Sequence, residues 1–179
     1  MKIYRIVTAR NAEGKSVFLS SGEAPRTHDF VHIPGAAQTQ IWATPAVPSL
    51  DGSVSDPTLE LTSLVPPAGG TRFAIVAFPP DSLMMGGDFD ALAAAEESQR
   101  ASPGLAELFE SDNPGMHTTD TVDYGIVLEG EIWLELDDGR MQHLRKHDVV
   151  VQNGTRHAWR NKGEQNALMA FVMIGARRS

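Results

Sequence analysis

Cysteine is absent from the 179 residues of this chain. Its absence excludes disulfide bonds, thiolate zinc ligands and cysteine nucleophiles. Long apolar runs are missing too, since no stretch reaches the roughly 18 consecutive apolar residues of a membrane-spanning helix. The first residues also lack the apolar core and the small-residue cleavage site of a signal peptide. These absences together predict a cytoplasmic protein that does not enter a membrane.

Basic residues are scarce relative to acidic ones. The chain has 15 Lys and Arg against 23 Asp and Glu, which gives a formal net charge of −8. Nucleic-acid phosphates require a basic surface, so this balance argues against a nucleic-acid partner. Apolar residues make up 41% of the chain and charged residues 21%, as is ordinary for a globular protein. The length favours one domain over residues 1–179.

Short β-prone runs separated by turn residues make up most of the chain. The pair Asp138-Gly139 is typical of a two-residue hairpin turn, and Glu129-Gly130 marks another turn. Many short strands at this spacing predict an all-β fold, a jelly-roll barrel. The expected strands are 2–8, 16–19, 39–43, 71–79, 124–136 (broken by its turn), 140–144, 149–152, 157–160 and 168–174.

Two stretches are expected to lack regular structure. Residues 20–36 are rich in Gly, Pro and Ser, and the histidines within them are expected to be ordinary surface residues. Residues 44–70 hold five of the 11 prolines and are expected to form an irregular connection. Three leucines are expected to anchor this connection to the barrel, namely Leu59, Leu61 and Leu64.

A helical insertion of residues 81–116 is expected to interrupt the strands. Residues 88–100 have Asp at their start and four alanines, which favours a helix. Ser102 is an expected N-cap and Pro103 the first position of a second helix. The insertion carries eight acidic residues against Arg100 alone, a net −7. It forms either a solvated helical face or an acidic lid over the barrel mouth.

Polar residues capable of binding a metal gather after the insertion. In an extended strand His117, Thr119, Thr121 and Asp123 share one face, because side chains alternate. His157 begins another short β-prone run. Two imidazoles and a carboxylate brought together by strands would form a 2-His-1-carboxylate site with open positions. The predicted metal ligands are therefore His117, Asp123 and His157.

The stretch that begins at Gly115 resembles the first motif of the cupin family, G-x5-H-x-H-x(3,4)-E-x6-G. His117 stands at the first histidine of that motif, and Thr119 stands where the family has its second histidine. Asp123 takes the place of the glutamate, seven residues before Gly130. The resemblance implies a double-stranded β-helix, the jelly-roll barrel of that family, here interrupted by the short helical insertion expected from the residues.

A second stretch resembles the other cupin motif, G-x5-P-x-G-x2-H-x3-N. Gly154, His157 and Asn161 match it in spacing. His147 replaces the opening glycine with the following segment one residue shorter, and Gln152 occupies the proline position. The expected single domain thus has N-terminal strands and a Pro-rich connection in residues 1–80, the helical insertion in 81–116 and the metal-site core of the barrel in 117–175.

Neighbouring residues are expected to support the metal or contact a substrate. Thr119 is a poor ligand and is expected to form hydrogen bonds around the site, as is Thr121. Gln152 is either a neutral ligand or a substrate contact, and Trp159 is either core or a ligand contact. Histidine and carboxylate ligands without sulfur suit a divalent metal ion, namely Fe, Mn, Ni or Zn.

The sequence is compatible with two functions. The first is a metal-dependent enzyme acting on a small organic substrate, such as an aromatic compound or a keto or hydroxy acid. The resemblance implies a dioxygenase, decarboxylase, isomerase or dehydratase without choosing among them. The alternative is a non-catalytic small-molecule-binding or sensor cupin with a reduced metal site. A homodimer is implied by the resemblance and by unpaired edges of the N-terminal strands.

Overall fold

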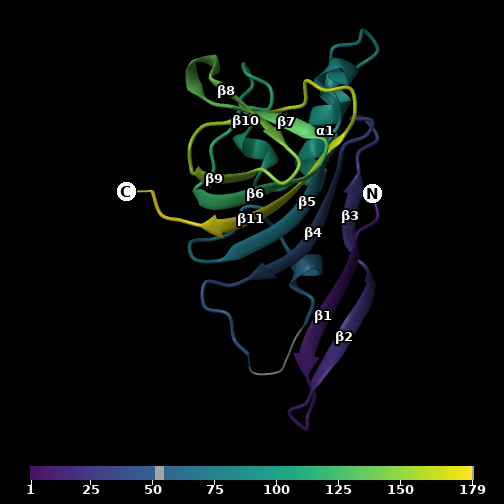
Figure 1. Cartoon of the computed structure of the whole chain (residues 1–179), viewed down its shortest axis with the longest axis vertical. Helices are drawn as coiled ribbons and strands as arrows, with labels where there is room; N and C mark the ends of the chain where they lie inside the picture. The colour runs from purple at the N-terminus through teal and green to yellow at the C-terminus, as the bar shows by residue number, and fades with distance from the viewer. Residues whose placement is uncertain (51–54, 179) are drawn as a thin grey trace.

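The computed structural model describes residues 1–50 and 55–178 (Figure 1). Within these residues the chain forms eleven β-strands and a single α-helix, with four short 3-10 turns between them. The strands are β1 (Tyr4–Arg10), β2 (Ser16–Glu23), β3 (Arg26–Asp29), β4 (Ala37–Thr44), β5 (Thr71–Phe78), β6 (Thr121–Glu129), β7 (Glu131–Glu135), β8 (Met141–Arg145), β9 (Val149–Asn153), β10 (Ala158–Arg160) and β11 (Ala167–Gly175). The helix is α1 (Ala91–Ala101), and the turns are η1 (Pro57–Glu60), η2 (Asp81–Met84), η3 (Ala106–Leu108) and η4 (Asp137–Gly139).

Two antiparallel sheets pack face to face to form the barrel. The larger has the order β3-β4-β5-β11-β6-β9, and the smaller has the order β10-β7-β8. The chain passes from β6 in one sheet to β7 in the other through Gly130, whose φ is 71°. An added Cβ there would lie 2.8 Å from the Asn166 carbonyl oxygen, so glycine is needed at the corner. The predicted all-β jelly roll is confirmed.

Apolar side chains between the two sheets form the core. Val127 of β6 and Met169 of β11 meet Ile132, Leu134 and Leu144 of the smaller sheet, and all five are buried. Along β6 the odd-numbered residues from 121 to 127 are buried, and the even-numbered ones are half-buried or exposed. The alternation that the sequence predicts for this strand is therefore present, and it directs one face into the barrel.

The β7–β8 hairpin forms where the sequence predicts it, and the strands expected at 2–8 and 16–19 pair with each other as β1 and β2. Asp138 and Gly139 have φ of 59° and 66°, as a tight hairpin turn with two left-handed residues requires. Strands β1 and β2 form a separate two-stranded sheet that projects from the barrel (Figure 1). Its outer side leaves Tyr4, Ile6 and Phe18 exposed.

The expectation of an irregular stretch over residues 20–36 is wrong in part. Strand β2 continues to Glu23, and β3 pairs with β4 in the larger sheet. Pro25 lies between the two strands, so the breaker residues separate two strands without preventing either. Of the leucines expected to anchor residues 44–70, Leu64 is buried, but Leu59 is 62% exposed. Part of that connection, residues 51–54, lies outside the described residues.

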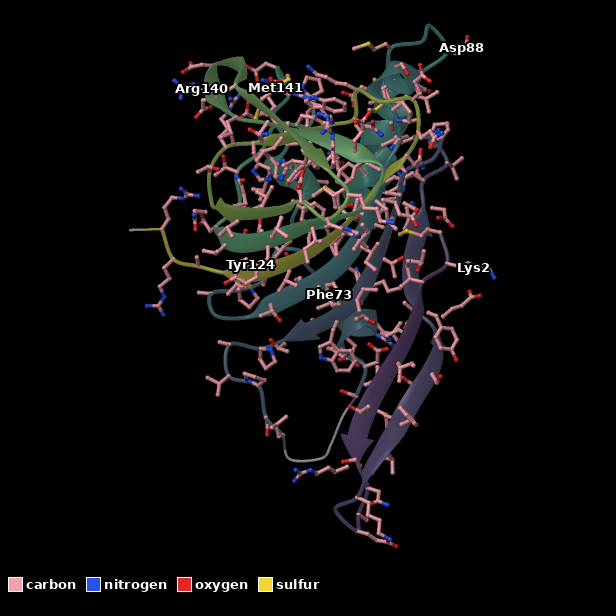
Figure 2. The ribbon with its side chains drawn as sticks, in the orientation of Figure 1. Lys2, Phe73, Asp88, Tyr124, Arg140 and Met141 are labelled. Carbon is pink, nitrogen blue, oxygen red and sulfur yellow. The ribbon has the colours of Figure 1, made fainter. Side chains whose placement is uncertain are left out.

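The helix α1 lies within the stretch predicted to be helical, with Asp90 as its N-cap accepting from the Ala93 N–H at 3.0 Å. The expected N-cap role of Ser102 is wrong, because Ser102 ends α1 and its N–H donates to the Ser98 carbonyl. Figure 2 shows Asp88 at the far end of the turn that precedes α1. No helix in the described part of the chain is long and apolar enough to cross a membrane.

Glu97 fixes α1 to the barrel. Its side chain is buried, accepts from the backbone N–H of Val31 and of His32 at 2.9 and 2.7 Å, and lies 2.9 Å from Nε2 of His28. These contacts tie the helix to the loop between β3 and β4. The face of α1 that carries Glu97 is therefore packed against the barrel.

Candidate functional site

His117 and His157 lie directly opposite each other on neighbouring antiparallel segments. The N–H of each donates to the carbonyl oxygen of the other, both at 2.9 Å. The two ring centroids are 4.3 Å apart, and the side chains are only 8% and 3% exposed. Main-chain pairing thus brings together two histidines that the sequence analysis predicted to share a site.

Each of these rings is held by a backbone carbonyl. Nδ1 of His117 lies 3.1 Å from the Gly115 oxygen, and Nδ1 of His157 lies 2.9 Å from the Thr155 oxygen. A carbonyl oxygen only accepts, so each Nδ1 carries the hydrogen, and each Nε2 keeps its lone pair. This is the arrangement in which a neutral imidazole can bind a metal through Nε2.

Burial keeps both imidazoles uncharged at neutral pH. It lowers the pKa of His117, although the Gly115 carbonyl and Glu110 act against this effect. Burial and the neighbouring His117 lower the pKa of His157 to about 4. Metal binding to histidine requires the neutral ring, so neither histidine has to lose a proton first.

Asp123 extends from β6 into the barrel interior, where it is 6% exposed. Its Oδ1 is buried and has no hydrogen-bond partner among the described residues. Burial raises the pKa of Asp123 to about 6, and the Thr121 hydroxyl lowers it only in part. A buried carboxylate with an unsatisfied oxygen is costly unless a cation or donor compensates it.

The predicted three-ligand set is not assembled in full. No group of three His, Cys, Asp or Glu in residues 1–50 and 55–178 is placed to hold a metal ion. Asp123 shares the barrel interior with His117 and His157 without joining them in such a cluster. The histidine pair is thus the part of the predicted site that the fold brings together.

The remaining predicted residues surround the site. Thr119 and Thr121 are buried, and their hydroxyls lie 2.7 Å apart. Gln152 pairs with Asp123 across the strands and donates through Nε2 to the Thr155 carbonyl at 3.0 Å. Gln152 thereby braces the turn that also holds the His157 ring.

Trp159 belongs to the aromatic packing of the barrel interior. Its ring lies edge-on to His157 at 5.9 Å and to Phe171 at 5.5 Å. Trp159 is also packed against the core cluster of the two sheets. It therefore separates the histidines from the apolar core.

Phe109, expected to face the barrel mouth if the insertion forms a lid, lies against His117, whereas sequence reasoning missed the partner of Arg156. Phe109 forms a β-bridge with His117, and its ring lies edge-on at 4.8 Å. The guanidinium of Arg156 donates to both carboxylate oxygens of Glu110, at 2.7 and 2.6 Å. Only the position of Arg156 next to His157 in the sequence could have indicated this contact.

Two further residues of the second motif have structural roles. Gly154 has a φ of 59°, and an added Cβ would lie 3.2 Å from the Thr119 carbonyl oxygen. Asn161 is buried and donates through Nδ2 to the carbonyls of Phe78 and Gln165, both at 2.8 Å. They shape the turns on either side of β10 and make no contact with the histidine rings among the hydrogen bonds of the described residues.

Comparison with known proteins gives partial and full-length similarities, and no family model matches the chain. A 63-residue part is 48% identical to "Phomopsin biosynthesis cluster protein C'" of Diaporthe leptostromiformis, covering 35% of this chain and 33% of that protein. A 65-residue part is 42% identical to "Oryzines biosynthesis cluster protein J" of Aspergillus oryzae, covering 36% of each chain. The matches to these relatives thus span about a third of their length.

A longer similarity extends over nearly the whole chain. It is 27% identity to "Cupin-domain-containing oxidoreductase virC" of Hypocrea virens, over 95% of this chain and 74% of that protein. The alignment therefore includes the N-terminal strands and the insertion as well as the stretch that carries the histidines.

Proposed function

We propose that this chain, which belongs to the cupin superfamily, is an oxidoreductase that uses a divalent metal ion to act on a small organic molecule. The observation that carries the proposal is the histidine pair. His117 and His157 are buried, adjacent and neutral, and each presents Nε2 with its lone pair available. Nearby, Oδ1 of Asp123 is a buried polar atom without a partner among the described residues, which is rare unless the atom has a functional role.

The donor set fits a metal in its chemistry. His117, His157 and Asp123 would hold the ion, and Fe, Mn, Ni and Zn accept such nitrogen and oxygen ligands. The unsatisfied Oδ1 of Asp123 is the atom that a cation would compensate. When bound, the metal would supply Lewis acidity or, if it is iron, redox chemistry.

The surroundings of the site suit a small organic substrate. Trp159 presents apolar ring surface beside His157 and packs in turn against Phe171, and Phe109 lies against His117. Such walls exclude water and favour aromatic or keto-acid molecules over nucleotides. The relatives named for biosynthesis clusters support a small-molecule substrate for this chain as well.

A second candidate, a non-catalytic binding cupin, is favoured by one observation. The described residues assemble no group of three metal-binding side chains, and Thr119 stands where the resemblance implies a histidine. In that case the barrel would hold a ligand between Trp159 and Phe109 without turning it over.

The test of the metal site is elemental analysis of protein purified without chelator. His157→Ala should reduce bound metal at least about tenfold, because half of the imidazole pair is lost. The matched control is His32→Ala, since that imidazole is exposed on a loop. Equal metal content in wild type and His157→Ala would refute the metal site.

Turnover separates the two candidate functions. Oxygen consumption by the metal-loaded protein would be followed with a panel of catechols and 2-oxo acids. Consumption that depends on His157 supports the oxidoreductase. Ligand binding in calorimetry without consumption or any product in mass spectrometry supports the binding protein.

A further inference from the structure

A hollow lies beside α1, away from the histidine pair. It has a volume of about 220 Å³ and is lined by residues of β3, β4 and the C-terminal end of α1. Figure 1 shows α1 next to these strands. The side chains that line it include Arg26, His28, Gln38, Gln40 and Arg100, and no Asp or Glu lines it. A hollow lined by cations and amides is unusual in a chain with a net charge of −8.

Arg26 contributes a positive charge that no acid compensates. Its Nη1 donates to the carbonyl oxygens of Thr58 and Leu61, at 2.8 and 2.7 Å. Across the described residues, no carboxylate forms an ion pair with Arg26. Carbonyl dipoles satisfy the N–H groups but carry no net charge, so the guanidinium charge remains.

A second uncompensated guanidinium lies near the first. Arg72 is buried, and it donates to the carbonyl oxygens of Ser63 and Thr71 at 3.2 and 2.9 Å. The part of the chain that the structure describes offers it no carboxylate within ion-pair distance either. Burial and the charge of Arg26 lower the pKa of Arg72. Positive potential therefore accumulates behind this hollow.

The amides that line the hollow differ in their bonding. Gln38 is satisfied, because it donates to the Ala101 carbonyl at 2.7 Å and accepts from the Ser102 hydroxyl at 3.2 Å. Gln40 lies opposite Arg26 in the β3–β4 register, and its Oε1 is buried without a partner among the described residues. This oxygen only accepts, so it is left for a water and cannot itself bond to an anion.

We propose that this hollow binds a small oxyanion, a carboxylate or a phosphate, with Arg26 as its main charge partner. Guanidinium groups pair with both kinds of oxyanion through charge-assisted hydrogen bonds. Arg100 lies at the rim, where its side chain is largely exposed and makes only a 3.9 Å contact with Glu96. The site is separate from the histidine pair and does not depend on the proposed metal chemistry.

The volume restricts the ligand to a small molecule. A hollow of about 220 Å³ is smaller than the roughly 300–1,000 Å³ of pockets for drug-sized ligands. Inorganic phosphate and short-chain acids such as citrate are therefore suitable probes. Their relative affinities decide which oxyanion the site prefers.

The test is isothermal titration of the whole chain with phosphate and, separately, with citrate. Arg100→Ala should weaken binding about tenfold, the effect of losing one charge-assisted contact. Its matched control is Arg10→Ala, which removes the same charge from an exposed position on the projecting hairpin. Arg26→Met should abolish binding, although that variant also loses two bonds to the connection after η1.

Two outcomes would overturn the proposal. One is the absence of heat from either probe at about 10 mM, far above the Kd of a specific site. The other is equal weakening by Arg100→Ala and Arg10→Ala, which would mean that the anion responds only to overall charge. If Arg26→Met does not fold, the comparison of Arg100→Ala with Arg10→Ala still tests the proposal.

Discussion

Asp123 places a carboxyl group in the barrel interior, where its Oδ1 has no partner among the described residues. Burial raises its pKa to about 6, well above the roughly 3.9 of an unfolded chain. The carboxyl group therefore favours folding most below pH 4, and this contribution is lost as the pH rises through 6. Above that range the ionised group destabilises a protein that holds no cation.

Asp123→Asn should consequently stabilise the metal-free chain at pH 8. The expected gain is about 2 kcal/mol in the free energy of unfolding, since two pKa units correspond to roughly 3 kcal/mol before relaxation. With excess metal the wild type should instead be the more stable of the two proteins, because only the aspartate carries a charge that compensates the ion. Urea unfolding at pH 8, with chelator and with metal, measures both. Destabilisation by Asp123→Asn under both conditions would contradict this account.

The pKa of Asp56 is shifted in the opposite direction, because its hydrogen bonds outweigh the effect of burial. Burial alone would raise its pKa, but bonds from Arg5 and from the hydroxyl and N–H of Thr58 hold it at about 2. A lowered pKa stabilises the fold above the unfolded value near 4, and this stabilisation is lost as the pH falls toward 2. The bond to Arg5 also connects η1 to β1.

Asp56→Asn should therefore cost about 1–3 kcal/mol at pH 7, the range for bonds to a charged group, and much less at pH 2. Asparagine still caps η1, so the substitution isolates the charge. Urea midpoints at both pH values give the comparison. A cost that stays constant from pH 7 to pH 2 would show that the charge is not the cause.

At the scale of elements, the segment after α1 covers the histidines. Phe109 lies against His117, and Glu110 is held by Arg156. Arg160 donates to the Pro114 carbonyl and to Asn113, at 2.6 and 3.2 Å. The helix itself is fixed by Glu97, so we place the proposed lid in residues 105–116 and not in the whole insertion.

Glu110→Gln should loosen this cover. The neutral amide loses the charge that pairs with Arg156, so amide hydrogens of residues 109–117 should exchange several-fold faster in a local opening. Glu107→Gln is the matched control, because Glu107 lies in the same segment but is exposed. Hydrogen exchange measured by mass spectrometry reports the segment directly. Unchanged exchange in Glu110→Gln would mean that Phe109 alone holds the cover.

The sequence predicted elements better than contacts between them. Period-two alternation placed His117 to Asp123 on one inward face, and turn residues marked most strand ends, because both signals are local. The packing of Glu97 and Arg156 joins segments far apart in the chain, and no periodicity marks it. Serine is a residue type that favours N-caps, but Ser102 is the C-cap of α1. Gln38 packs against this end of the helix and bonds to Ala101 and Ser102.

At the scale of the whole molecule, the outer face of the larger sheet carries a row of apolar side chains. One register row runs from Val151 through Tyr124 and Val172 to Phe73. Tyr124 and Val151 are 44% and 57% exposed, and Figure 2 labels Tyr124 and Phe73 in the larger sheet. Exposed apolar side chains gathered in one place mark a surface that another molecule covers. A twofold axis brings the same residues of two chains together, so a row without charged side chains suits the homodimer that we propose.

Val151→Glu should convert that dimer to a monomer. It would place two carboxylates in the interface, and burying such charges costs several kcal/mol. Val31→Glu is the control, since Val31 is also exposed but lies on the loop between β3 and β4. Sedimentation at about 10 µM, a concentration at which a specific dimer persists, gives the mass. A monomeric wild type would refute the interface.

The reciprocal main-chain bonds between His117 and His157 bear on how such a site evolves. Every residue type carries the N–H and C=O groups that set this pairing, so neighbouring side chains can drift while the two imidazoles keep their places. Thr119 and Gln152 depart from the cupin motifs at such neighbouring positions. A mutation of Thr119 to histidine would restore the motif without removing any of the backbone bonds that hold the pair. The main chain thus keeps His117 and His157 in place while side chains at neighbouring positions, such as 119 and 152, can change.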